Sequence, residues 1–231
     1  MEEKVPKDAQ VSSKSNGKTP SAKKTEIIRH FTSVECLESI LQDGLKMGNA
    51  DDWKDQNDSH DVQHYAKLQN GKNVLVLCFC ADKGNVHHWN SLKNGEDLMC
   101  SIDIRKNDFF EYIKKLDGFQ KPKSVIYCNN DDVLNLQNTD DLPYLKRVEY
   151  EIEKEIRILY VGKETEVYIP NIRDYVEQIT IGTSDDEKIK QIKEELKKKL
   201  SESLRVPITT NGFMNSKFWQ QNIDKIIANS K

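Results

Sequence analysis

The chain has 231 residues, of which 32% are charged, and a formal net charge of −3. This length predicts one domain with tails, and the charge excludes a general attraction to nucleic acid. No apolar run approaches the roughly 20 residues that span a bilayer, and Met1-Glu2-Glu3-Lys4 lacks the apolar core of a signal peptide. The five cysteines are scattered, mostly through apolar segments, as reduced thiols usually are. We therefore expect a cytoplasmic protein without a membrane segment.

The amino-terminal half predicts a tail followed by folded sequence. Residues 1–25 are rich in Lys, Ser, Asn and Pro, which predicts a disordered tail before a single domain over residues 26–231. A short strand is expected over 27–31. Thr32 with Glu35 reads as a capping box for a helix that ends at Gly44, where a positive φ is favoured.

The remaining pattern predicts an α+β fold. Residues 74–80 form a continuous apolar run, typical of a central buried strand. Ser184 and Glu187 read as a second capping box, and residues 205–231 as a helical extension. Strands and helices alternate irregularly and without repeats, which predicts a mixed or antiparallel sheet flanked by helices. The other expected elements are helices over 62–68, 88–92, 108–116 and 218–228, and strands over 98–104, 124–128 and 176–181.

A charged segment follows at residues 147–161, and its period of two predicts one strand with two opposed faces. The even positions are apolar except Lys154, whereas every odd position from Arg147 to Arg157 is charged. Four carboxylates on one face repel each other unless that face meets water, cations or a polar ligand. The strand therefore borders solvent or walls a polar cleft.

Glu153 and Glu155 are the candidate catalytic pair. On one strand face their side chains lie about 7 Å apart, so one orients a hydroxyl while the other balances developing positive charge at a sugar ring. Arg157 would hold a phosphate or pair with Glu155. The alternative is a solvated strand whose glutamates have cross-strand Lys or Arg partners.

Histidines offer two further candidates. His30 ends the first strand immediately before a helix, where it would hydrogen-bond a ligand hydroxyl, although a lone histidine more often has a structural role. His60 and His64 have the one-turn spacing of metal ligands, but the histidines and cysteines together have no recognised zinc spacing. We predict no metal site.

Four blocks, in order over about residues 28–198, resemble the bacterial family called domain of unknown function 2971. Ile152 and Ile156 stand where that family has aromatic residues. The blocks are His30-Phe31-Thr32-Ser33 with residues 40–45, residues 53–58, Cys78-Phe79-Cys80 with His88-Trp89, Gly95 and residues 100–103, and residues 150–157.

The layout of that family is similar to that of ADP-ribosyltransferases, including DNA-targeting toxins. The resemblance implies a split sheet and NAD as the substrate. Glu155 would stabilise the oxocarbenium-like centre and Glu153 would orient the acceptor. The implied NAD-binding residues are His30, Thr32, Trp89 and Arg157.

Three functions follow as hypotheses. The first is an NAD-dependent ADP-ribosyltransferase-like enzyme, a toxin or phage-defence effector that modifies nucleic acid or protein and has an antitoxin or defence partner. The second is a non-catalytic binding module of a defence or regulatory complex, with the charged strand as its docking surface. The third is a metal-dependent nuclease.

Overall fold

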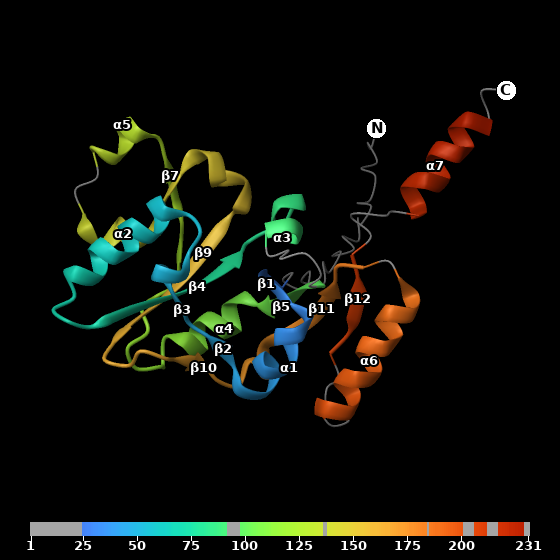
Figure 1. The fold of residues 1–231 in the computed structure, drawn as a ribbon, viewed down its shortest axis with the longest axis horizontal. Helices are drawn as coiled ribbons and strands as arrows, with labels where there is room; N and C mark the ends of the chain where they lie inside the picture. The colour runs from blue at the N-terminus through green and yellow to red at the C-terminus, as the bar shows by residue number, and fades with distance from the viewer. Residues whose placement is uncertain are drawn as a thin grey trace, which may run out of the picture.

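The computed structural model describes residues 25–91, 98–135, 138–183, 185–200, 206–211 and 217–228 (Figure 1). The predicted tail, apart from Thr25, lies outside these ranges. No helix within them has both the length and the apolar character needed to cross a membrane.

A mostly antiparallel sheet forms the centre of the molecule. β11 and β12 pair in parallel, and the other pairs of this sheet are antiparallel. The predicted mixed sheet of an α+β fold is confirmed. The described residues give eight strands in the order β12 (Ile208–Thr210), β11 (Val176–Ile181), β5 (Met99–Arg105), β1 (Ile27–Ser33), β4 (Asn73–Cys80), β9 (Glu155–Gly162) and β6 (Lys123–Ser124), with β3 (Gly48–Asn49) on β4.

The sheet divides between β1 and β4. β1 pairs with β5 along its whole length, and β4 pairs with β9 from Asn73 to Cys80. β1 and β4 meet at a single register position, Arg29 opposite Cys80. The two halves therefore separate beyond that point, and the divide leaves room for a cavity.

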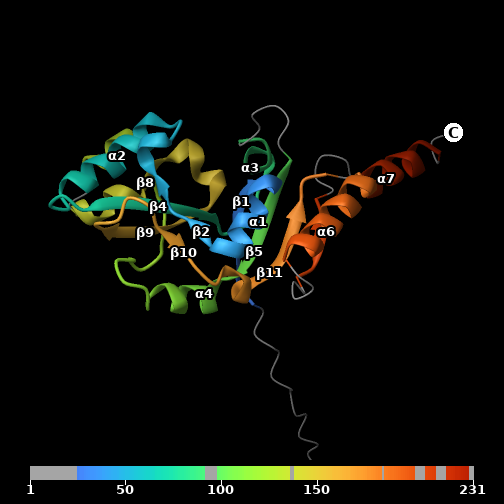
Figure 2. The same cartoon turned by 60° about the horizontal axis from the view of Figure 1, so that its bottom comes forward.

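Helices cover both faces of the β4–β9 half. Leu77 and Ile158 point into the main core, and Val76 and Leu159 point into a second core with Val62 of α2. Figure 2 shows α2 and α4 on opposite sides of these strands. The helices are α1 (Val34–Asp43), α2 (Gln56–Lys67), α3 (Val86–Ser91), α4 (Lys106–Ile113), α5 (Asn130–Val133), α6 (Asp186–Leu200) and α7 (Lys217–Ala228).

Short elements complete the described chain. β2 (Leu45–Lys46) pairs with β10 (Tyr168–Ile169), and β7 (Ile126–Cys128) pairs with β8 (Leu145–Arg147). The 3-10 helices are Ala50–Asp52, Thr139–Tyr144, Val148–Glu153 and Ile172–Tyr175.

The first of the two predicted capping boxes is wrong. Thr32 belongs to β1, and Ser33 precedes α1 without a side-chain capping hydrogen bond. Ser184 lies outside the described residues, and the carboxylate of Asp185 accepts from the amides of Glu187 and Lys188 at the start of α6. The carboxyl-terminal extension is not wholly helical, because β12 adds a strand to the sheet edge.

The single strand predicted over 147–161 is wrong. β8 ends at Arg147, a 3-10 helix follows, and Lys154 has φ of 48° before β9 begins at Glu155. A left-handed residue cannot continue a strand. Glu149 and Glu151 are exposed on the 3-10 helix, so the four carboxylates do not share a face.

Gly44 ends α1 with φ of +112°, as the sequence predicts. A Cβ there would lie 2.3 Å from the carbonyl oxygen of Ile169, whereas Gly71 has φ of +78° and open space. We expect Gly71→Ala to cost about 1–2 kcal/mol of unfolding free energy, from the positive φ alone. Gly44→Ala should cost about 1–3 kcal/mol more, from the clash. Equal losses in urea unfolding would contradict this packing.

Candidate functional site

A cavity of about 560 Å³ opens at the divide between β1 and β4. Its walls come from the ends of these strands, from the segment before α2, from α3, and from the 3-10 helix that leads into β9. Aromatic and aliphatic side chains line part of it, and charged side chains line the rest. The main lining residues are Arg29, His30, Phe31, Trp53, Lys54, Asp58, Val76, Cys78, Phe79, His87, Lys146, Glu153 and Glu155.

Three of the predicted site residues meet in this cavity: His30, Glu153 and Glu155. His30 Nδ1 lies 3.2 Å from the carbonyl oxygen of Cys78. A carbonyl can only accept, so Nδ1 carries the hydrogen and Nε2 of a neutral ring is an acceptor. Burial lowers the pKa of His30, which favours that neutral form. His30 therefore offers an acceptor for a ligand hydroxyl.

The other three predicted residues lie behind the cavity lining. Thr32 is buried in β1, and Trp89 packs edge-on against Phe31 with ring centroids 5.2 Å apart. Arg157 has a relative exposure of 0%. Their contact with NAD stays a prediction, and the contacts they make here are within the protein.

Arg157 is the centre of a buried ion cluster, and of its two predicted roles the pairing with Glu155 is confirmed. Its guanidinium donates to Asp58 over 2.8 and 2.5 Å, and its Nε donates to Glu155 over 2.7 Å. A further hydrogen bond reaches the carbonyl of Pro143, and the guanidinium lies 5.2 Å from the centroid of Trp53. Arg157 thereby fixes α2 and β9 against each other.

Glu155 is held ionised within this cluster. Burial would raise its pKa, but Arg157 and Lys146 outweigh burial and lower it to about 2. Glu153, one residue before the left-handed Lys154, meets the same ammonium: Lys146 Nζ lies 2.5 Å from Glu153 and 2.9 Å from Glu155. The two carboxylates are thus neighbours, although they do not share a strand face.

Of the partners of the carboxylates, the sequence predicted Arg157 for Glu155 but did not point to Lys146, His87 or Asp58. Lys146 lies in a short strand of mixed character, and His87 Nε2 reaches Glu153 at 3.1 Å from α3. Asp58 falls at the end of the second resemblance block, and its role as the Arg157 partner depends on the tertiary fold. In the described ranges no three His, Cys, Asp or Glu side chains are arranged to hold a metal ion.

Comparison with known proteins gives few matches. No protein-family model matches the chain, and no curated protein matches it, so the resemblance to domain of unknown function 2971 stays a prediction. Among solved structures, Thermus sp. 2.9 DarT in complex with ADP-ribosylated ssDNA is 13% identical, with a TM-score of 0.43, over 81% of this chain and 95% of that chain. DarT from the same source in complex with NAD+ is 14% identical, with a TM-score of 0.39, over 81% and 96%. At these scores the likeness carries no weight for function, which has to be inferred from this chain's own residues.

Proposed function

We propose that this chain is an NAD-dependent ADP-ribosyltransferase-like enzyme whose active site is the cavity between β1 and β4. One observation carries the proposal: His30, Glu153 and Glu155, from distant parts of the chain, line one cavity that also has aromatic walls. Such a mixture suits a ligand with flat rings, ribose hydroxyls and phosphates.

Each part of NAD finds a matching group. Trp53, Phe31 and Phe79 offer aromatic surface for the flat rings of NAD. His30 accepts a hydrogen bond from a ribose hydroxyl. Lys54 is an exposed cation of the lining, and within the described ranges no carboxylate pairs with it. We assign it to the diphosphate.

The chemistry follows from the two carboxylates. The bond between ribose C1′ and the nicotinamide nitrogen breaks, the electron pair leaves with nicotinamide, and the ring becomes oxocarbenium-like. Glu155, ionised at all ordinary pH values, stabilises that positive charge. A lone pair of the acceptor then attacks C1′, and Glu153 at the cavity wall takes the acceptor's proton.

Lys54→Ala tests where the diphosphate binds. We expect the KM for NAD to rise roughly tenfold with little change in kcat. The contact of Lys54 with the diphosphate contributes the same binding free energy in the ground state and in the transition state. The measurement is nicotinamide release by the purified protein. Lys115→Ala, an exposed lysine outside the cavity lining, is the control. An unchanged KM in Lys54→Ala would remove Lys54 from the site.

A second candidate function is a nucleotide-binding module without catalysis. It is favoured by the engagement of Glu155, whose oxygens already accept from Arg157 and Lys146. This function predicts NAD binding in calorimetry, with no nicotinamide release from wild type. Expression of the wild-type protein is compared with expression of Glu155→Gln in bacteria. Growth that is impaired by the wild type and normal with the variant would support the toxin or defence role.

A further inference from the structure

Lys146 has a position that neither proposed role of the carboxylates explains. Its ammonium lies 2.5 Å from Glu153, 2.9 Å from Glu155 and 3.6 Å from Asp58. The side chain is 11% exposed, and Nζ lies 5.0 Å from the ring centroid of Tyr150. A largely buried lysine with three carboxylates around it is held in place by charge.

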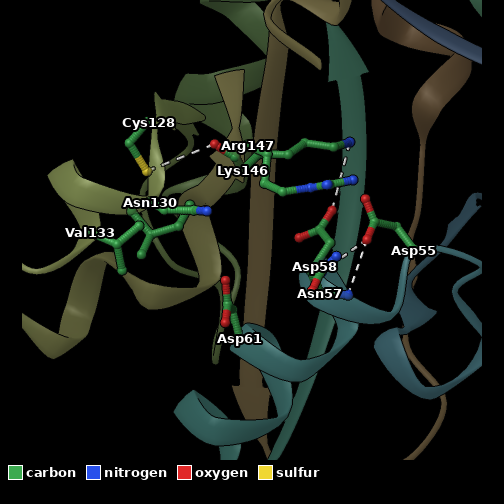
Figure 3. Close-up of a pocket in the computed structure, with 10 residues that line it drawn as sticks. Asp55, Asn57, Asp58, Asp61, Cys128, Asn130, Val133, Lys146 and Arg147 are labelled. Carbon is green, nitrogen blue, oxygen red and sulfur yellow. Dashed lines mark hydrogen bonds and ion pairs between the residues drawn. The ribbon is translucent and has the colours of Figure 1, made fainter. Parts of the chain in front are cut away.

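Lys146 also lies between two cavities. Besides the large one, it lines a small cavity of about 40 Å³ with Asp55, Asp58 and Arg147. Figure 3 shows the side chain of Lys146, from β8, reaching toward Asp58, with a dashed line between them. Lys146 therefore crosses from the wall of one cavity to the wall of the other.

The charges of the cluster require this cation. Three carboxylates, from Asp58, Glu153 and Glu155, face two cations, Lys146 and Arg157. Arg157 contacts Asp58 and Glu155, and Lys146 supplies the cation that bridges Glu153 to Glu155. Without it, two carboxylates would lie close together in a partly buried site, and like charges at that range hinder each other's ionisation.

We propose that Lys146 is a positioning residue for the catalytic pair, because its shared ammonium holds the carboxylate of Glu153 beside that of Glu155. The inference deepens the proposed function and rests on it for its catalytic consequence. The geometric part, that one lysine unites the pair, concerns the protein without ligand.

The groups around the pair decide how it titrates. α2 contributes a carboxylate, β9 a guanidinium, β4 a thiol, β7 and the 3-10 helix phenols, and α3 two imidazoles. Burial raises the pKa of the Cys78 thiol well above its usual value, and burial raises the pKa of Tyr127 to about 12, so neither loses its proton near neutrality. The facing groups are Asp58, Arg157, Cys78, Tyr127, Tyr150, His87 and His88.

The experiment follows carboxyl carbons by NMR in protein labelled with ¹³C at glutamate and free of NAD. In wild type, Glu155 should not titrate between pH 4 and pH 8. In Lys146→Met the upper midpoint of the pair should rise by about one pH unit or more, and Lys146→Arg should restore it. Lys123→Met is the matched control, because Lys123 also lies over a tyrosine ring and pairs with one acid outside the cavity. Superimposable curves for wild type and Lys146→Met would overturn the proposal.

A second variant keeps the test decisive if Lys146→Met does not fold. Lys146→Met with Glu153→Gln restores the net charge of the cluster, so it should fold with a Tm near that of wild type. A double variant as unfolded as the single one would overturn the proposal.

A kinetic arm separates this inference from the proposed function. Lys146→Met should lower kcat at acid pH with KM little changed, so the acid limb of its pH profile should move up with the NMR midpoint. The NMR midpoint could rise in Lys146→Met although the wild-type protein releases no nicotinamide. That result would contradict the proposed enzymatic function and still support the positioning role of Lys146.

Discussion

Glu155→Gln should reduce nicotinamide release from NAD by roughly 100-fold or more, the usual loss when one electrostatic stabiliser of a transition state is removed. The amide keeps the shape of the side chain but has no negative charge. In the wild type, Arg157 and Lys146 keep the carboxylate of Glu155 ionised. The loss should appear in kcat, because the charge on the sugar develops only as the bond opens.

Glu111→Gln is the control for this change. Glu111 is also paired with a lysine, Lys114, but it is 67% exposed on α4 and outside the cavity lining. A thermal melt establishes the folded fraction of each variant, so that lost activity is not confused with lost structure. Full nicotinamide release by folded Glu155→Gln would show that Glu155 belongs to the structural cluster alone.

Arg157→Met should destabilise the protein by about 3–5 kcal/mol, which is typical when one partner of a buried ion pair is removed. Asp58 and Glu155 would each lose their guanidinium contacts, and Asp58 is only 5% exposed. Urea unfolding measures the effect as a lower midpoint with a similar slope.

The ion pairs of Arg105, which is partly exposed and has exposed partners, provide the comparison. Arg105→Met removes ion pairs to Asp108 and Glu177 and a hydrogen bond to the carbonyl of Asp174, and exposed ion pairs contribute about 1 kcal/mol or less. Arg157→Met combined with Asp58→Asn should recover part of the loss, since it removes one unbalanced carboxylate. If Arg157→Met were no worse than Arg105→Met, the buried cluster would not be what holds α2 to β9.

Much of the fold follows from local pattern. The predicted strand over 74–80 is β4, and the predicted helix that ends at Gly44 is α1. Both were predictable because a buried strand is a continuous apolar run and a helix end with positive φ favours glycine. Even within the wrongly predicted strand, the alternation holds from Glu155 onward: Ile156 and Ile158 enter the main core.

The site was predicted less completely, for physical reasons. His30, Glu153 and Glu155 do meet, but the 3-10 turn that brings the glutamates together depends on Lys154 adopting φ of 48°. Lysine has no intrinsic preference for that conformation, so the sequence carries no sign of it. The pairing of Arg157 with Glu155 was predicted from the sequence, whereas its pairing with Asp58 depends on the tertiary placement of α2.

Label transfer from NAD labelled in its adenine is the most direct measure of whether the cavity performs ADP-ribosyl transfer. Purified protein is incubated with the labelled NAD and bacterial lysate, and nucleic acid and protein fractions are separated. The enzyme should move label into one of these fractions with matching release of nicotinamide, and folded Glu155→Gln should move almost none. Binding of NAD with neither transfer nor release would contradict the enzyme and leave a nucleotide-binding module.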